Sequence, residues 1–135
     1  MTDPLVGAVE RIGDRWSLLI VDALLPGPRR FNELAGDVEG IAPNILSARL
    51  RRLESEAIVV GRPYSRRPLR VAYELTATGR ELAGALRLLT HWAARFAGSG
   101  EAPRHEACGT PMEARWYCPT CTTIVDETEE ELRYV

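Results

Sequence analysis

The sequence lacks three features, and each absence excludes a class of function or location for the protein. No apolar run reaches the roughly 18 residues that a membrane span needs, so we expect no membrane partner. The opening residues place charges soon after Asp3-Pro4 and do not resemble a signal peptide, so we expect a cytoplasmic protein. There is no Ser/His/Asp grouping, phosphate-cradling glycine loop or paired-carboxylate motif strong enough to indicate catalysis, and we predict that the protein is not an enzyme.

Lysine is absent throughout, and cysteine is absent from the first 107 residues. All 17 basic residues are therefore arginine. The three cysteines lie at positions 108, 118 and 121. An odd number of cysteines clustered near a histidine, in a chain without a secretion signal, argues against a disulfide framework.

The net charge of -2 conceals an uneven distribution along the chain. Residues 41–70 contain seven arginines and two glutamates, a local net charge of +5. Residues 101–135 contain three arginines and eight acidic residues, a local net charge of -5. Positive charge concentrated in one segment is the electrostatic pattern expected of a nucleic-acid-binding surface.

The segment at 41–57 predicts a DNA-reading helix. Leu46, Leu50 and Leu53 recur at steps of four and three, so they share one face, and Pro43 suits a first helical turn. The opposite face has small or polar side chains and no acid; its residues are Asn44, Ser47, Ala48, Arg51 and Ser55. Such a face fits a major groove, because bulk would block entry and acids would repel phosphate. The solvated face of a core helix would show the same pattern.

The segments before this helix predict a helix-turn-helix unit. Apolar residues at helical spacing from 16 to 24 predict one helix, which Pro26-Gly27-Pro28 ends. Arg30-Phe31 predicts a brief strand, and Asn32 is the expected N-cap of a short helix that reaches Val38. A short helix, a turn at Gly40 and the helix that follows it form the helix-turn-helix pattern.

After Ala57 the apolar period changes to two. We expect strands at 58–62 and 70–75, joined by a loop at 63–68. A hairpin with a basic tip directly behind a reading helix is typical of a wing, although a basic loop exposed to solvent is the alternative. We expect four arginines there to contact phosphates or a minor groove: Arg62, Arg66, Arg67 and Arg70.

A long apolar stripe follows Thr76, which is expected to cap the next helix. Leu5, Val6, Val9 and Ile12 predict a short amphipathic helix at the start of the chain. The late aromatic residues of the long stripe exceed what a small core can cover, so we predict a homodimer contact made by these two helices. The residues predicted for that contact are Leu5, Val9, Leu82, Leu86, Leu89, Trp92 and Phe96.

The segments Gly13–Ile20, Gly27–Leu34, Gly40–Glu54, Val71–Thr76 and Gly79–Leu82, with Trp92-Ala93, resemble the HxlR-type, MarR-like branch of bacterial winged-helix regulators. The resemblance covers about residues 5–97 and is specific in the order and spacing of its motifs. It implies a mainly α winged helix-turn-helix domain with a small antiparallel hairpin. It also implies a homodimer on a pseudo-palindromic operator, acting mostly as a repressor.

Three departures from the family pattern have physical consequences. Ala42 stands where a serine N-cap is usual, which weakens the helix start by about 1 kcal/mol. Ala57 stands where a glycine usually ends the reading helix, at a site that often favours a left-handed backbone. Some thiol- and quinone-sensing relatives have a cysteine near the N-terminus, and this chain has none there. We therefore do not assign the sensing chemistry of those relatives to this protein.

Specific roles follow for the DNA-binding residues. We expect base contacts from Asn44, Ser47 and Arg51, whereas Arg49 and Arg52 join the hairpin arginines in holding the backbone of double-stranded DNA. The alternative is a protein-interaction adaptor that docks on the transcription machinery. The residues identify no effector, whether a small molecule or a redox signal.

The C-terminal residues contain the pattern His105-x2-Cys108-x9-Cys118-x2-Cys121. Two close pairs of soft ligands on two short turns predict one tetrahedral, structural Zn²⁺ per chain in a zinc-ribbon-like module. A Cys118–Cys121 redox disulfide, or a three-cysteine site without His105, are the competing interpretations. The expected organisation is a DNA-binding and dimerisation domain at 1–97, a linker at 98–104, the module at 105–125 and an acidic tail at 126–135.

Overall fold

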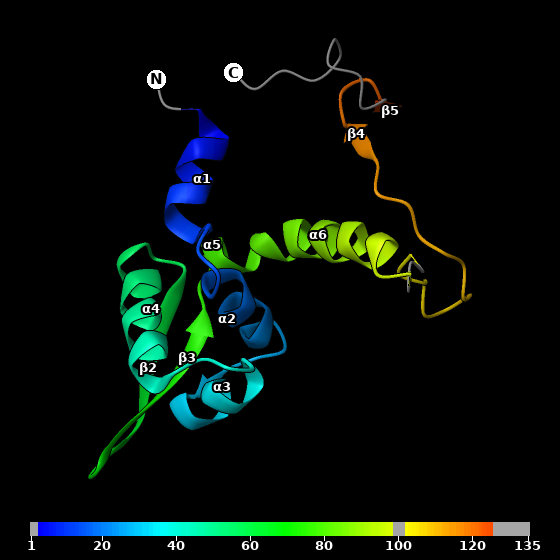
Figure 1. Cartoon of the computed structure of the whole chain (residues 1–135). Helices are drawn as coiled ribbons and strands as arrows, with labels where there is room; N and C mark the ends of the chain where they lie inside the picture. The colour runs from blue at the N-terminus through cyan, green and yellow to red at the C-terminus, as the bar shows by residue number, and fades with distance from the viewer. Residues whose placement is uncertain (1–2, 99–101, 126–135) are drawn as a thin grey trace. The chain divides into compact units, whose positions relative to one another are not determined.

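The computed structural model describes residues 3–98 and 102–125 (Figure 1). The predicted acidic tail, and residues 99–101 of the predicted linker, lie outside the described residues. The chain divides into two compact units, Met1–Arg87 and Leu88–Val135, and the boundary falls inside the last helix. Within the described ranges, no helix is long and apolar enough to cross a membrane.

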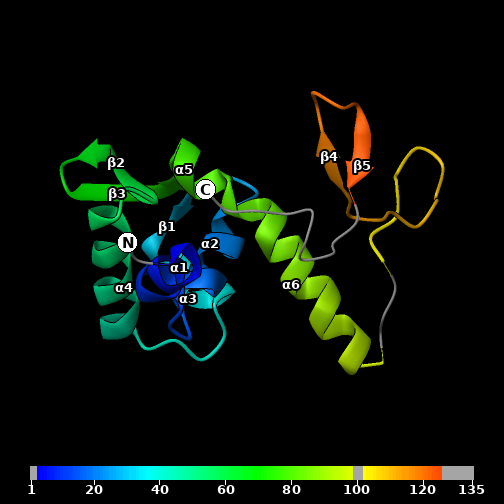
Figure 2. The same ribbon diagram turned by 90° about the horizontal axis from the view of Figure 1, so that it is seen from above.

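The first unit alternates helices with a small sheet. Its elements, in chain order, are α1 (Pro4–Ile12), α2 (Ser17–Leu24), β1 (Arg29–Arg30), α3 (Phe31–Asp37), α4 (Pro43–Ser55), β2 (Val59–Arg66), β3 (Leu69–Leu75), α5 (Ala77–Arg80) and the start of α6 (Leu82–Phe96). The second unit contains the rest of α6 and a hairpin of β4 (Trp116–Cys118) and β5 (Thr123–Val125). Helix α4 and the β2–β3 hairpin lie side by side in the first unit (Figures 1 and 2).

The hydrophobic core of the first unit forms around the leucines of α4. Leu46, Leu50 and Leu53 are at most 1% exposed, which confirms the face predicted from their spacing. They pack in one cluster with Ile20 of α2 and Leu34 of α3. Helix α4 therefore has one face in the core, and its opposite side faces outward.

The three-stranded sheet is antiparallel, with the order β1-β3-β2. The hairpin is longer than predicted, because pairing continues through Arg66 and Leu69 and leaves a two-residue turn. Pro63 lies inside β2, where the sequence predicted a loop. An edge strand tolerates proline because one row of its backbone groups has no partner strand, and β2 is such an edge. A register shift between Pro63 and Ser65 leaves Tyr64 unpaired.

Helix α3 begins two residues earlier than the sequence predicted, because an N-cap at Asn32 would have placed the first helical residue at Glu33. It begins at Phe31 with Arg30 in the N-cap position, so Asn32 is not the N-cap. The reason is that Arg29 and Arg30 pair with Tyr73 and Ala72 of β3, and this brings the chain directly into the helix.

Arg29 ties β1 to α3. Its guanidinium lies 2.9 Å from a carboxylate oxygen of Asp37 and 3.0 Å from one of Glu33. The hydrogen bonds to Asp37 and its negative charge, followed by the charge of Glu33, raise the pKa of Arg29 above its ordinary value.

Asp14 joins the start of α2 to α4. One of its carboxylate oxygens accepts the N–H groups of Trp16 (2.9 Å) and Ser17 (3.1 Å), and the other accepts the Ser17 hydroxyl. Arg49 of α4 lies 3.1 Å from the first of these oxygens. Burial alone would raise the pKa of Asp14, but these hydrogen bonds and the charge of Arg49 hold it below 3.8.

Both ends of α4 show the departures noted in the sequence. Ala42 occupies the N-cap position without a side-chain hydrogen bond. At the other end, Ile58 N–H donates to the carbonyl of Leu53 (2.9 Å) and Ala57 N–H donates to that of Glu54 (3.0 Å), which is a Schellman motif. Ala57 has φ = 57°, so a non-glycine residue occupies the left-handed position that the sequence predicted.

Replacing Ala57 with glycine should raise the free energy of unfolding by about 1 kcal/mol, because glycine adopts the left-handed conformation without the steric penalty of a Cβ atom. Ala48→Gly provides a matched control in the middle of the same helix. It should lower stability by about 1 kcal/mol. Urea unfolding of both variants measures the difference, and a destabilised Ala57→Gly protein would contradict the explanation.

Asp14→Asn should lower the free energy of unfolding by about 1 kcal/mol at neutral pH, because asparagine can still cap the turn but cannot pair with Arg49. The folded-state pKa of Asp14 lies below its ordinary value, so its contribution is complete above about pH 4 and disappears as the pH falls through the lower folded-state value. The stability gap between variant and parent should therefore narrow below about pH 4. The control is Asp22→Asn, because Asp22 has no side-chain partner among the described residues. A gap that stays constant in urea unfolding would contradict the role of Asp14.

Candidate nucleic-acid interface

The outward face of α4 presents the residues predicted to read bases. Asn44 and Arg51 are exposed, and Ser47 is half-buried. All three lie on the side opposite the buried leucines, as the helical period requires. Because the core holds the leucine face, this polar face is presented in a fixed orientation.

Four of the predicted arginines keep their guanidinium groups available. Across residues 3–98 and 102–125, no hydrogen bond or ion pair is found for the side chains of Arg51, Arg66, Arg67 and Arg70. One of them lies on α4, and the other three lie at and beside the turn of the β2–β3 hairpin. The hairpin therefore has the basic tip that the sequence predicted.

Three other arginines that were predicted to bind DNA have partners within the protein. Arg52 donates to the backbone carbonyl of Glu10 in α1, and Arg62 pairs with Glu74 across the hairpin. Arg49 pairs with Asp14, and both side chains are less than one third exposed. These contacts favour a structural role for Arg49. The side chain of Arg62 is 69% exposed, so it can exchange Glu74 for another partner.

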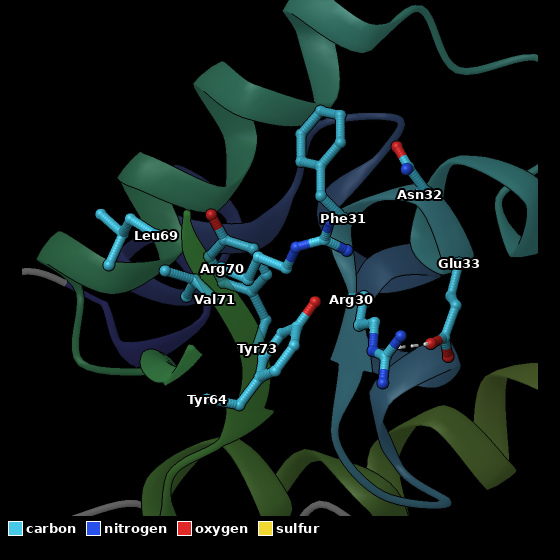
Figure 3. A pocket seen from close by; sticks show the side chains of 9 residues that line it. All are labelled: Arg30, Phe31, Asn32, Glu33, Tyr64, Leu69, Arg70, Val71 and Tyr73. Carbon is cyan, nitrogen blue, oxygen red and sulfur yellow. Dashed lines mark ion pairs between the residues drawn. The ribbon is translucent and has the colours of Figure 1, made fainter. Parts of the chain in front are cut away.

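A pocket of about 600 Å³ lies between the start of α3 and the hairpin (Figure 3). Arg30 of β1 stacks over the ring of Tyr64, 4.7 Å from its centre, and Arg70 also lines the pocket. Burial, followed by the charge of Glu54, raises the pKa of Tyr73 in the wall, so this phenol stays neutral near pH 7.

Sequence reasoning did not identify Arg30 or Tyr64 as part of this surface. The adjacent arginines at 29–30 were the one signal in the sequence. Neighbouring side chains of a strand point to opposite faces, so one of the two could be expected to face the hairpin. The pairing of β1 with β3 and the bulge at Tyr64 bring the two residues together, and no local pattern in the sequence predicted either contact. Arg30 therefore extends the arginine-bearing surface of the hairpin to the start of α3, where it lies 3.7 Å from the carboxylate of Glu33.

The predicted metal ligands form two separate pairs in the second unit. His105 Nδ1 lies 3.3 Å from Cys108 Sγ, and the backbone N–H of Cys121 lies 3.5 Å from Cys118 Sγ. In the part of the chain that the structure describes, no three side chains of His, Cys, Asp or Glu converge on one point. The structure thus brings together the members of each pair but does not bring the two pairs together.

Local hydrogen bonds set different thiol acidities in these pairs. Thr110 lowers the pKa of Cys108 through its side chain and its backbone. The backbone N–H groups of Cys121 and Thr120 lower the pKa of Cys118. The neighbouring sulfur of Cys118 in turn raises the pKa of Cys121.

The residues predicted for a dimer contact have different environments. Leu86 is 8% exposed and belongs to the core cluster, and Leu82 packs against that cluster. The structure therefore assigns Leu86 to the core of its own protomer, because a buried side chain cannot meet a partner. The remaining residues of the set are between 49% and 75% exposed: Leu5, Val9, Leu89, Trp92 and Phe96.

A reading helix, a preceding short helix and a basic hairpin together define a winged helix-turn-helix protein. Comparison with known families agrees, because the model of the HxlR-like helix-turn-helix family matches residues 11–101. The chain belongs to this family.

Relatives in two bacterial groups are similar over most of the chain. An uncharacterised HTH-type transcriptional regulator of Mycobacterium tuberculosis is 38% identical over 118 residues, covering 84% of this chain and 74% of its own length. A stretch of that length cannot fit within residues 1–101, so the match includes part of the C-terminal segment. The transcriptional regulator YodB of Bacillus subtilis is 32% identical over 101 residues, covering 75% of this chain and 90% of its own length.

Solved structures share the fold of the first part of the chain. The reduced form of YodB from B. subtilis has a TM-score of 0.62 and 33% identity, covering 71% of this chain and 95% of its own. The regulator YtcD has a TM-score of 0.68 and 31% identity, covering 72% of this chain and 99% of its own. YodB has also been solved in diamide-treated and quinone-bound forms.

The arginines that have no partner in the described part of the chain should matter more for DNA affinity than those already paired. Replacing Arg66 or Arg67 with alanine should weaken binding to all duplexes and reduce the slope of log K against log salt by about 1 per chain. Arg62→Ala, on the same hairpin, is the matched control. Its effect should be smaller, because its pairing with Glu74 competes with phosphate. Fluorescence anisotropy at several salt concentrations measures the slopes, and equal losses for all three variants would contradict this distinction.

Proposed function

We propose that this chain is a sequence-specific DNA-binding transcriptional regulator with a zinc-ribbon-like module at residues 105–125. One observation carries the DNA-binding proposal: the acid-poor outer face of α4 lies beside the β2–β3 hairpin, and among the described residues Arg51 and three hairpin arginines have no side-chain partner. The printed names of the relatives, which are HTH-type transcriptional regulators, support the same class.

The proposed division of labour separates base contacts from backbone contacts. Arg51, with Asn44 and Ser47, reads base edges in the major groove, because guanidinium and amide groups match the donor and acceptor patterns found there. Arg66, Arg67 and Arg70 contact phosphates or the adjacent minor groove. Arg52 and Arg62 contribute to backbone contact only when they leave their partners within the protein.

The proposal includes a homodimer that binds a pseudo-palindromic operator and represses transcription. The exposed apolar side chains of α1 and of the later part of α6 support this assembly, because water is a poor environment for such large apolar surfaces. Two identical reading helices related by a twofold axis would recognise two half-sites of opposite orientation.

The proposal is tested by selecting binding sites from random or genomic DNA with the purified full-length protein. We expect a symmetric footprint, a dimer in sedimentation at micromolar concentration, and a loss of about 1–3 kcal/mol in discrimination for Arg51→Ala. Arg49→Ala is the control on the same helix, because it should lower folding stability without changing which base is preferred.

Two results would argue against the proposal. A monomer at micromolar concentration would remove the homodimer. Co-purification with RNA polymerase, together with no enrichment of any DNA sequence, would instead support an adaptor that docks on the transcription machinery.

A further inference from the structure

We infer that His105, Cys108, Cys118 and Cys121 bind one zinc ion, which joins two preformed turns of the C-terminal segment. The inference deepens the zinc-ribbon-like module of the proposed function and is independent of DNA binding. It is argued from the geometry of each turn, the chemistry of the four donor groups and the lack of buried residues within 102–125.

The first turn holds His105 and Cys108 at the spacing of two ligands on one ion. His105 N–H donates to the carbonyl of Thr110 (2.8 Å), and Gly109 N–H donates to that of His105 (2.7 Å). Gly109 has φ = 71°, which a glycine adopts without strain. The 3.3 Å between His105 Nδ1 and Cys108 Sγ is close to the donor separation of about 3.5 Å that zinc–nitrogen and zinc–sulfur bonds define at a tetrahedral centre.

The second turn connects β4 to β5 and holds Cys118 and Cys121. Cys118 pairs with Thr123 across the hairpin, so the four-residue connection between them is fixed at both ends. Within it, the backbone N–H of Cys121 lies 3.5 Å from Cys118 Sγ. This contact places Cys118 and Cys121 on one tight turn, as the Cys-x2-Cys spacing of a zinc ligand pair requires.

The described part of this segment has no core that would hold the two turns together. None of residues 102–125 is buried, and only Ala102, Cys118 and Val125 are half-buried. The large side chains of the second turn's hairpin are exposed, including Tyr117 at 60% and Ile124 at 62%. A segment this short, with so little buried apolar surface, needs a cross-link to keep one conformation.

A zinc ion supplies that cross-link. One imidazole and three thiolates are a ligand set that zinc commonly takes in structural sites. The nine residues between Cys108 and Cys118 can span up to about 30 Å, so they leave the turns free to close on one ion. Four protein ligands fill the coordination sphere and leave no position for a substrate, so the ion is structural.

The test measures metal in the full-length protein, purified under reducing conditions, without DNA. Elemental analysis should give one zinc per chain, and Cys118→Ser and Cys108→Ser should each lose it. Replacing zinc with Co²⁺ should produce the visible bands of a tetrahedral ion with sulfur-to-cobalt charge transfer. In the parent protein, alkylation of the cysteines should be slow with zinc bound and fast after chelation, a readout that needs no variant.

His105 is tested against the other histidine of the chain. His105→Ala should weaken zinc binding by more than the roughly 10–100-fold that typically follows loss of an outer-sphere partner, whereas His91→Ala on α6 should leave it unchanged. Unchanged affinity in His105→Ala would overturn the four-ligand site in favour of three cysteines. Reduced parent protein that neither contains nor takes up zinc, or a Cys118–Cys121 disulfide in its place, would overturn the inference. Because no DNA is present, these results are distinguishable from failure to bind an operator.

Discussion

The burial of Leu46, Leu50 and Leu53 is the constraint on which the rest of the first unit depends. A helix with one face in a close-packed core cannot rotate without exposing that face, and each buried leucine contributes about 2 kcal/mol or more to holding it. The opposite face of α4, with Asn44 and Arg51, is therefore presented at a set angle. The ion pair of Arg49 with Asp14 adds a second restraint from the start of α2.

Partners within the protein divide its arginines into two groups. Arg49 and Arg29 have carboxylate partners and hold elements of the fold together. Arg51 and the arginines near the hairpin tip have no such partners in the described residues, so they keep their charge for an external anion. This separation explains how a chain with a net charge of -2 can present a strongly basic surface, because the charge that matters is local.

The spacing of apolar residues and the conformational preferences of individual residues predicted much of the architecture. The leucine spacing identified the buried face of α4, and Ala57 has the left-handed backbone that its position implied. Thr76 caps a helix as expected, but that helix, α5, ends at Arg80, and the apolar stripe lies on the separate helix α6. The missed details depend on contacts distant in sequence. Pairing of β1 with β3 moved the start of α3 away from Asn32, the edge position of β2 admitted Pro63, and packing placed Leu86 in the core. The roles of Asn44, Ser47 and the metal ligands remain predictions, because they concern molecules beyond the chain.

The salt dependence of DNA binding by the purified protein tests the central claim most directly. Three arginines near the hairpin tip have no partner in the described residues, so a dimer would neutralise about six phosphates and give a slope of log K against log salt of about -5. A slope near this value on a selected operator, and a similar slope on unrelated duplexes with weaker affinity, is the result expected of a surface that holds the backbone while α4 reads the bases. Affinity that does not change with salt, or no binding to any duplex, would contradict the account.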